Sequence, residues 1–206
     1  LFFAPFVFRR RIGHGRRFWA GSLYFVAIGL GFMLIEASWL QRLVLYLGHP
    51  SRATTVGLAA ILAGAGLGSM ASSRLDVDRA VRAGWLVPLA LAAVTLGLEP
   101  LFAATVGAPL AARVVIAVAV LSPAAFFMGF CFPVGMARFG GPSNAWFWAL
   151  NGAAGVLSGA LSLALAMELG LERVGLLGCT IYVCACGLAN LPKSQDNSVI
   201  MEPSSH

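Results

Sequence analysis

The chain has 206 residues, of which 59% are hydrophobic and only 11% are charged, and its formal net charge is +6. Because soluble domains carry about 25% charged residues, this composition excludes a water-soluble globular fold. It predicts an all-α fold, a polytopic integral membrane helix bundle in which each span needs about 20 apolar residues.

Charged residues enclose six apolar segments, which we predict to be transmembrane helices. In chain order they are residues 18–46, 53–73, 83–98, 114–132, 145–167 and 174–191. The second is the clearest, because no ionisable side chain lies between Arg52 and Arg74 and the segment would be about 31 Å long at about 1.5 Å per residue. Pro133 is expected to end or kink the fourth helix, since proline removes a backbone hydrogen bond.

Three regions therefore make up the predicted organisation. Residues 1–17 form a basic juxtamembrane segment of aromatic and arginine residues, which suits either contact with anionic lipid or the end of a longer upstream sequence. Residues 18–191 form the six-helix transmembrane domain. Residues 192–206 form a polar C-terminal tail.

The basic residues predict the orientation of the helices. One side of the membrane would carry Arg9, Arg10, Arg11, Arg16, Arg17, Arg74, Arg79, Arg82, Arg138 and Lys193. The other would carry Arg42, Arg52, Arg113 and Arg173. The positive-inside rule then places both termini in the cytoplasm. The net charge is a topology signal, and we predict no binding to nucleic acid.

Glycines indicate where helices approach each other closely. Gly64 and Gly68 in the second span, and Gly155 and Gly159 in the fifth, are four residues apart, so each pair shares one helix face. We predict that both faces pack inside the bundle. The alternative is a homo-oligomer, in which the faces contact another copy of the chain.

Polar residues within or beside the spans are the candidate binding residues: Glu36, Gln41, His49, Arg113 and Asn151. A carboxylate in an apolar span is costly unless it is paired, protonated or functional. Glu36 is therefore either a structural ion-pair partner or hydrogen-bond acceptor, with Arg113 within reach, or part of a substrate or proton path, or a neutral acid facing lipid. Asn151 is expected to form an interhelical hydrogen bond.

The sequence contains no recognised catalytic set. It has no HExxH, GxSxG or P-loop motif. Cys184 and Cys186 are two residues apart and point to different helix faces, which does not suit a metal site. We predict no catalytic residue, no metal site, no cofactor and no disulfide framework.

Three segments carry a resemblance to a known family. GFMLIEASWLQRLVLYLGHP (31–50), FFMGFCFPVGM (126–136) and WFWALNGAAGVLSGALS (146–162) resemble the C-terminal membrane region of bacterial spermidine synthase-like membrane proteins. The similarity covers residues 18–191. Cys131 stands where the family pattern often has proline, and the nucleotide-binding glycine motif and acidic residues of the synthase are absent.

The resemblance implies a location in the bacterial inner membrane and a cytoplasmic aminopropyltransferase- or methyltransferase-like domain upstream of the helices. The leading hypothesis is a non-catalytic membrane module that contacts lipid and anchors, or is an accessory subunit of, such a domain or a larger membrane complex. The second is a transporter or channel-like module that admits a small cation such as a polyamine to a polar cavity at Glu36. The third is an enzyme half-site that delivers a membrane-soluble substrate.

Overall fold

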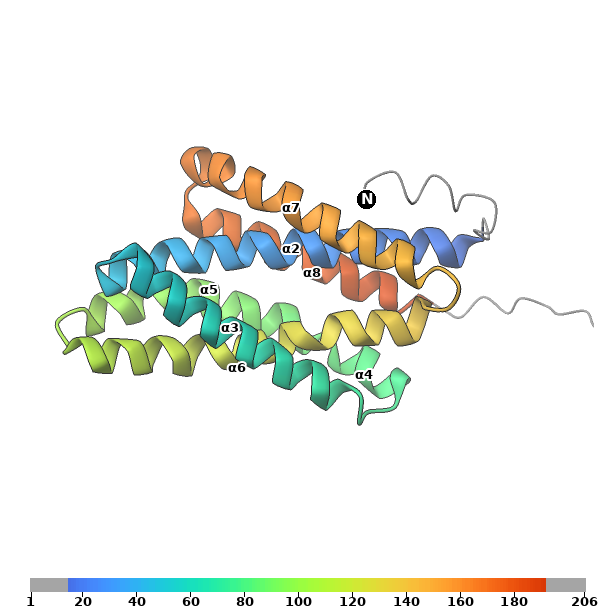
Figure 1. The fold of residues 1–206 in the computed structure, drawn as a ribbon, viewed down its shortest axis with the longest axis horizontal. Helices are drawn as coiled ribbons and strands as arrows, with labels where there is room; N and C mark the ends of the chain where they lie inside the picture. The colour runs from blue at the N-terminus through green and yellow to red at the C-terminus, as the bar shows by residue number, and fades with distance from the viewer. Residues whose placement is uncertain (1–14, 192–206) are drawn as a thin grey trace, which may run out of the picture.

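A computed structural model describes residues 15–191 of the chain. These residues form seven α-helices and no β-strand, and the bundle is drawn in Figure 1. The predicted segments 1–14 and 192–206 lie outside the described residues. The helices are α2 (Arg16–Leu47), α3 (Pro50–Ser72), α4 (Val77–Ala83), α5 (Leu86–Thr105), α6 (Leu110–Phe139), α7 (Asn144–Leu169) and α8 (Leu171–Ala189).

Six helical segments are long and apolar enough to cross a membrane, as the sequence predicted. Five are single helices, and the sixth is the stretch Val77–Thr105, in which the short α4 leads into α5. The sequence placed the start of this third span at residue 83 and its end at 98. The observed helix continues through Pro100 to Thr105, because the buried residues Leu98 and Phe102 pack its last turns into the bundle.

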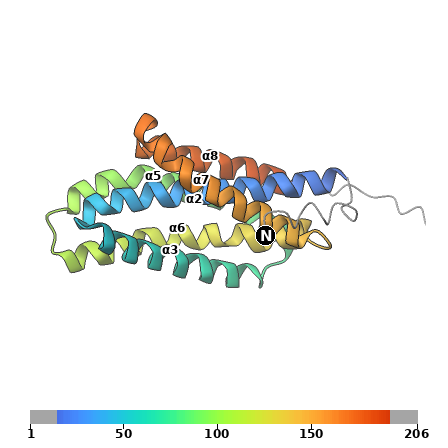
Figure 2. The same ribbon diagram turned by 45° about the horizontal axis from the view of Figure 1, so that its top comes forward.

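Successive long helices run in opposite directions (Figures 1 and 2). We call the end of the bundle where α2 begins and α8 ends the basic end, because the exposed Arg17, Arg74, Arg79 and Arg82 lie on the segments that meet there. The opposite end, where α2 ends and α8 begins, is called the far end. Because the long helices alternate in direction, the connections α3–α5 and α6–α7 lie at the basic end, and the connections α2–α3, α5–α6 and α7–α8 lie at the far end.

The centre of the bundle is α2, which contacts α3, α5, α6, α7 and α8. Its residues Phe25, Ile35, Trp39 and Leu43 are completely buried. In a membrane protein such burial reflects helix-to-helix packing rather than escape from water, because lipid is as apolar as the side chains. A polar side chain on the inner faces of α2 must consequently find its partners within the protein.

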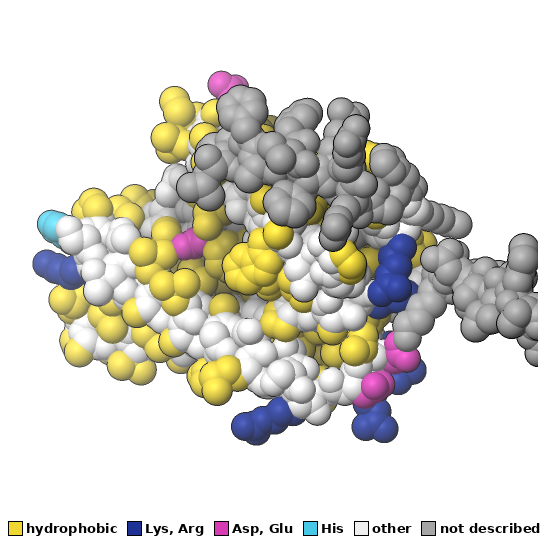
Figure 3. All heavy atoms as spheres, turned by 45° about the vertical axis from the view of Figure 1, so that its right-hand side comes forward, with side chains coloured by type: hydrophobic (Ala, Val, Ile, Leu, Met, Phe, Trp, Pro, Cys, Tyr) yellow, Lys and Arg dark blue, Asp and Glu magenta, His cyan; other side chains and the backbone are white. Residues whose placement is uncertain are grey.

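Apolar side chains cover much of the outer surface. Leu62, Leu89, Val156 and Met167 are each more than 60% exposed. Figure 3 shows hydrophobic side chains spread over the visible face, with arginine side chains near its two ends. This distribution is the reverse of that in a soluble protein and suits contact with hydrocarbon.

The fourth predicted helix does not end at Pro133. The helix α6 continues to Phe139, and the last turns carry buried residues, including Val134 and Arg138. Gly135 lies directly against the rings of Tyr24 and Phe25 on α2. These contacts hold the helix beyond the proline, although proline lacks the N–H of a regular helical turn.

The glycines of α3 lie where its backbone approaches α6. A Cβ at Gly64 would meet Ser122 and Ala125, and a Cβ at Gly68 would meet the backbone of Phe126. Gly129 of α6 lies in the same way against the backbone of Ala65. Glycines of both helices therefore allow the backbones of α3 and α6 to approach closely along this contact.

The glycine pair of α7 is different. A Cβ placed at Gly155 would have only ordinary van der Waals contacts with α2, the nearest being Cγ of Met33 at 3.6 Å. Nothing lies within 4 Å of a Cβ placed at Gly159. The expected close packing of this pair inside the bundle is not formed among the described residues. The reason is that α7 packs on α2 through another face, on which Phe147, Ala154, Ser158 and Ser162 are buried.

The contact between α3 and α6 predicts opposite effects for two glycines of one helix. Gly68→Ala is expected to lower the melting temperature, because overpacking costs about 1–3 kcal/mol. Gly66→Ala is the matched control, since nothing lies within 4 Å of its Cβ, and it should leave stability unchanged or raise it by up to about 1 kcal/mol. Circular dichroism of the purified protein in detergent measures both. Equal melting temperatures would contradict the close contact.

Candidate functional site

Glu36 lies on an inner face of α2, about 16 Å before the end of the helix at Leu47. Its side chain is only 8% exposed, and Oε2 has no hydrogen-bond partner among the described residues. Tyr182 of α8 is within electrostatic range of the carboxyl group. A buried carboxyl oxygen without a partner is unusual, because it loses hydration and gains no hydrogen bond in exchange.

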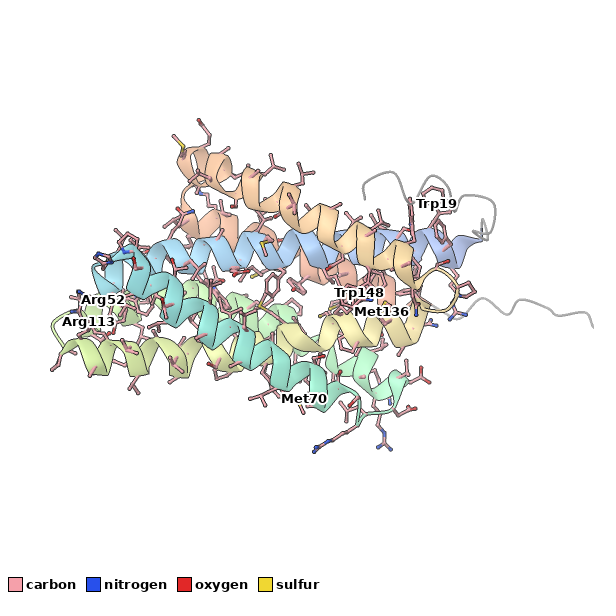
Figure 4. All side chains as sticks on the ribbon, in the orientation of Figure 1. Trp19, Arg52, Met70, Arg113, Met136 and Trp148 are labelled. Atoms are coloured by element: carbon pink, nitrogen blue, oxygen red, sulfur yellow. The ribbon has the colours of Figure 1, made fainter. Side chains whose placement is uncertain are left out.

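Arg113 does not pair with Glu36, contrary to the expectation from depth along the helices. Its Nη1 donates to the carbonyl oxygen of Tyr46 at 2.7 Å, and its guanidinium lies 5.9 Å from the centre of the Tyr46 ring. Tyr46 is about 15 Å beyond Glu36 along α2. Figure 4 shows Arg113 at the far end of the bundle, the end at which Arg52 also lies. The ion pair is replaced by a bond to the backbone.

The remaining predicted site residues lie at separate levels. Exposed His49 precedes α3, where its Nδ1 accepts from the backbone N–H of Ser51 at 3.3 Å, so it caps the helix. Asn151 donates to the carbonyl oxygen of Phe25 at 3.1 Å, which is the expected interhelical hydrogen bond. Gln41 is half-buried on α2.

These positions exclude one shared cavity for the five predicted residues. Asn151 lies at the level of Phe25, and Arg113 lies at the level of Tyr46. The two positions on α2 are separated by about 30 Å, the length of a membrane core. Glu36 lies between them and contacts neither group.

An apolar cavity of about 460 Å³ lies between α2, α6 and α7. Its walls include Phe32, Met33 and Phe132, while Gly155 and Gly159 leave space on the side of α7. Asn151 is part of the lining, but its amide is already bonded to α2. The cavity therefore offers mainly hydrocarbon-like surface.

A larger groove, of about 830 Å³, opens at the far end and was not expected from the sequence. We call it the far-end groove. It is bordered by α2, α5 and the turn from α7 into α8, and its lining residues are Arg42, Leu45, Tyr46, Glu99, Phe102, Ala103, Val106, Leu169, Gly170, Leu171, Glu172 and Arg173.

The groove exists because α8 begins deep in the bundle. Ser38 Oγ donates to the carbonyl oxygen of Leu171, the first residue of α8, at 2.6 Å. Ser38 lies about 13 Å before the end of α2 at Leu47. The last turns of α2 therefore have no neighbouring turn of α8 beside them, and the space is left open.

Arg42 forms the deepest polar part of this groove. It is 7% exposed, and its Nη1 donates to the carbonyl oxygen of Thr95 at 2.7 Å. Its Nη2 lies 3.9 Å from Oε2 of Glu172, whose side chain is half exposed. Trp39 Nε1 donates to Thr95 Oγ1 at 3.1 Å, so Thr95 joins two residues of α2 to α5. One end of the guanidinium is fixed, and the other faces a loosely held partner.

The sequence contained a signal for this site. Arg42 lies within the predicted span 18–46, where a charged residue is by default a candidate functional residue, but it was counted only toward topology. Glu99, Glu172 and Arg173 gave no comparable signal, because charges at helix ends are common.

Comparison of the chain with protein-family models, curated proteins and solved structures finds no match. No match links the chain to spermidine synthase-like membrane proteins, and that resemblance stays an expectation from the three sequence segments.

The absence of a hydrogen bond to Glu36 Oε2 predicts that the charge is not needed for folding. Glu36→Gln is expected to keep or raise the melting temperature, because a buried unpaired carboxylate is replaced by a neutral amide. Arg42→Gln is the contrasting variant and should cost about 1.5–3 kcal/mol, since a charged hydrogen bond to Thr95 is lost. Thermal unfolding in detergent compares them. Destabilisation by Glu36→Gln would support the structural-pair interpretation instead.

Proposed function

We propose that the chain is an integral membrane module, with both ends of the helical domain on the cytoplasmic side, that anchors or accompanies a cytoplasmic domain or a larger membrane complex. The observation that carries this proposal is the bundle of six apolar helices with exposed hydrophobic side chains between two charged ends.

The exposed charges favour a cytoplasmic basic end. At that end Arg17, Arg74, Arg79 and Arg82 are all exposed. At the far end two of the four arginines that the sequence counted are directed into the protein, because Arg42 and Arg113 donate to backbone carbonyl groups. Four exposed arginines at the basic end against the exposed Arg52 and Arg173 at the far end give the asymmetry on which the positive-inside rule depends.

The basic end is also a firm point of attachment. Arg138 of α6 donates to the carbonyl oxygens of Ala189 at 3.3 Å and Leu191 at 2.6 Å, so it satisfies the C-terminus of α8. Arg17 at the start of α2 donates to the carbonyl oxygen of Arg138 at 2.8 Å. The first and last helices are therefore connected through α6, and a domain joined at either end would be held against the same surface.

Labelling of introduced cysteines tests the orientation and anchoring. A membrane-impermeant maleimide is expected to label Gly107→Cys, in the turn between α5 and α6, in intact cells. Ser73→Cys, after α3, should react only when the membrane is opened. The parent chain provides the background, because its described cysteines lie within α6 and α8. A soluble fluorescent reporter fused before Leu1 should remain in the membrane pellet after alkaline carbonate extraction.

The opposite labelling pattern, or release of the reporter by carbonate, would contradict this proposal. Turnover of a polyamine or methyl-group substrate by the purified chain alone would contradict its non-catalytic part.

We propose as a second function that Glu36 binds a small cation, such as a polyamine, in transit across the bundle. One observation favours it: the Oε2 atom is buried and has no hydrogen-bond partner among the described residues. A carboxylate without a protein partner can be neutralised by a cation or a proton, whereas a paired carboxylate cannot without breaking its pair.

Uptake by proteoliposomes tests the second function. The purified chain is expected to accumulate a radiolabelled polyamine, and Glu36→Gln should reduce the rate at least about tenfold, because only the charged group attracts the cation. Glu168→Gln is the matched control, since it removes an exposed carboxylate at the end of α7. Unchanged uptake in Glu36→Gln, with the protein still folded, would disprove this role.

A further inference from the structure

The far-end groove contains positive and negative side chains in equal number. Arg42 and Arg173 carry positive charge, and Glu99 and Glu172 carry negative charge. Arg42 and Glu172 are 3.9 Å apart, too far for a hydrogen bond. Within the described residues, neither Glu99 nor Arg173 has an ion pair. The groove therefore holds opposite charges that the protein leaves largely unsatisfied.

The positive side of the groove is preorganised for an anionic group. The bond from Arg42 to Thr95 holds the guanidinium in place, while Nη2 has no hydrogen bond to the described residues. The N-terminus of α8 borders the same space, and its N-cap residue, Gly170, provides no side chain to satisfy the first N–H groups. Arg173 adds a second guanidinium in the first turn of α8. Phosphate and carboxylate groups match this set of donors.

The acidic residue without an ion pair among the described residues, Glu99, lies on a different helix from Glu172 and Arg173. Glu99 is exposed on α5, one turn before Phe102 and Ala103. It lines the groove from α5, the helix that packs beside α8, and an ammonium group is its natural ligand. A simple anion would leave Glu99 unsatisfied, and a simple cation would leave the arginines unsatisfied, so a ligand with both charges fits better than either.

Apolar side chains make up much of the rest of the groove lining. The rings of Tyr46 and Phe102 are stacked, with centroids 3.9 Å apart and planes 3° apart. The Tyr46 hydroxyl is hydrogen-bonded to Thr105 Oγ1 at 2.8 Å, which leaves the aromatic pair rigid. Leu45 and Val106 continue the apolar lining toward the surface. The volume of about 830 Å³ is within the range of about 300–1,000 Å³ typical of small-molecule sites.

We propose that the far-end groove binds a zwitterionic, amphipathic molecule, with its phosphate or carboxylate group at Arg42, Arg173 and the N-terminus of α8 and its ammonium group at Glu99. Glu172 then releases Arg42 to the ligand. The chemistry is shared by an ethanolamine phospholipid headgroup and by a soluble aminoalkyl phosphate or amino acid. The site is independent of Glu36, which is directed into the bundle from another face of α2.

Calorimetric titration of the purified chain in a non-ionic detergent tests the site. The probes are phosphoethanolamine, glycerol phosphate as the anion alone, and ethanolamine as the cation alone. We expect phosphoethanolamine to bind at least about tenfold more tightly than either partial ligand, which corresponds to about 1.4 kcal/mol. Arg173→Gln and Glu99→Gln should each remove this advantage. Both residues are exposed, so neither substitution is expected to unfold the protein.

A control variant and a lipid-binding measurement distinguish the possible ligands of the groove. Arg52→Gln is the matched control, because it removes an exposed arginine at the same end that does not line the groove, and its binding should be unchanged. Native mass spectrometry from nanodiscs compares phosphatidylethanolamine with phosphatidylglycerol. Selective retention of the former, lost in Glu99→Gln, identifies a lipid headgroup as the source, and binding of phosphoethanolamine without lipid selectivity identifies a soluble ligand.

Absence of both phosphoethanolamine binding and lipid selectivity would overturn the proposal. It would also be overturned if glycerol phosphate or ethanolamine bound as tightly as the zwitterion, or if Arg52→Gln lost as much affinity as Arg173→Gln.

Discussion

The close contact between α2 and α8 determines most of the remaining geometry. Gly31 and Gly178 face each other, and a Cβ at either would meet the opposite helix, at Tyr182 or at Ile35. This contact holds α8 beside the middle of α2, where Ser38 bonds to the first residue of α8. Two features follow from that depth: the open groove at the far end, and the position of the first residue of α8 beside Ser38, one turn before Arg42 on α2.

The buried Arg42 and Arg138 and the half-buried Arg113 bond to backbone carbonyl groups, although Nε of Arg113 has no hydrogen-bond partner among the described residues. Arg42, Arg113 and Arg138 each donate to a carbonyl oxygen of another helix. A guanidinium has five N–H donors in a planar fork, so it can join helices without an acidic partner. This arrangement strengthens the bundle and leaves Glu36 and Glu99 available. Pairing charges by depth alone missed it, because carbonyl acceptors are present at every turn of every helix and have no sequence signature.

The glycine and proline patterns predicted only part of the helix packing. The spacing of Gly64 and Gly68 marked a face of α3, and that face does lie on α6. The same spacing at Gly155 and Gly159 marked a face that the described bundle leaves open, because α7 packs on α2 through a different face. Pro133 was expected to end or kink α6, and the first alternative is wrong, because contacts made by later residues extend the helix to Phe139.

Composition and the spacing of charges determined that the chain is helical, with six segments long and apolar enough to span a membrane. Those properties depend on the hydrophobicity of consecutive residues, which is local information. The tertiary structure alone decided that Glu36 Oε2 has no hydrogen-bond partner among the described residues, that His49 caps a helix, and that Arg42, Glu99, Glu172 and Arg173 line one groove. Their positions depend on the relative depth of helices that are distant in the chain, and depth is set by side-chain packing along α2.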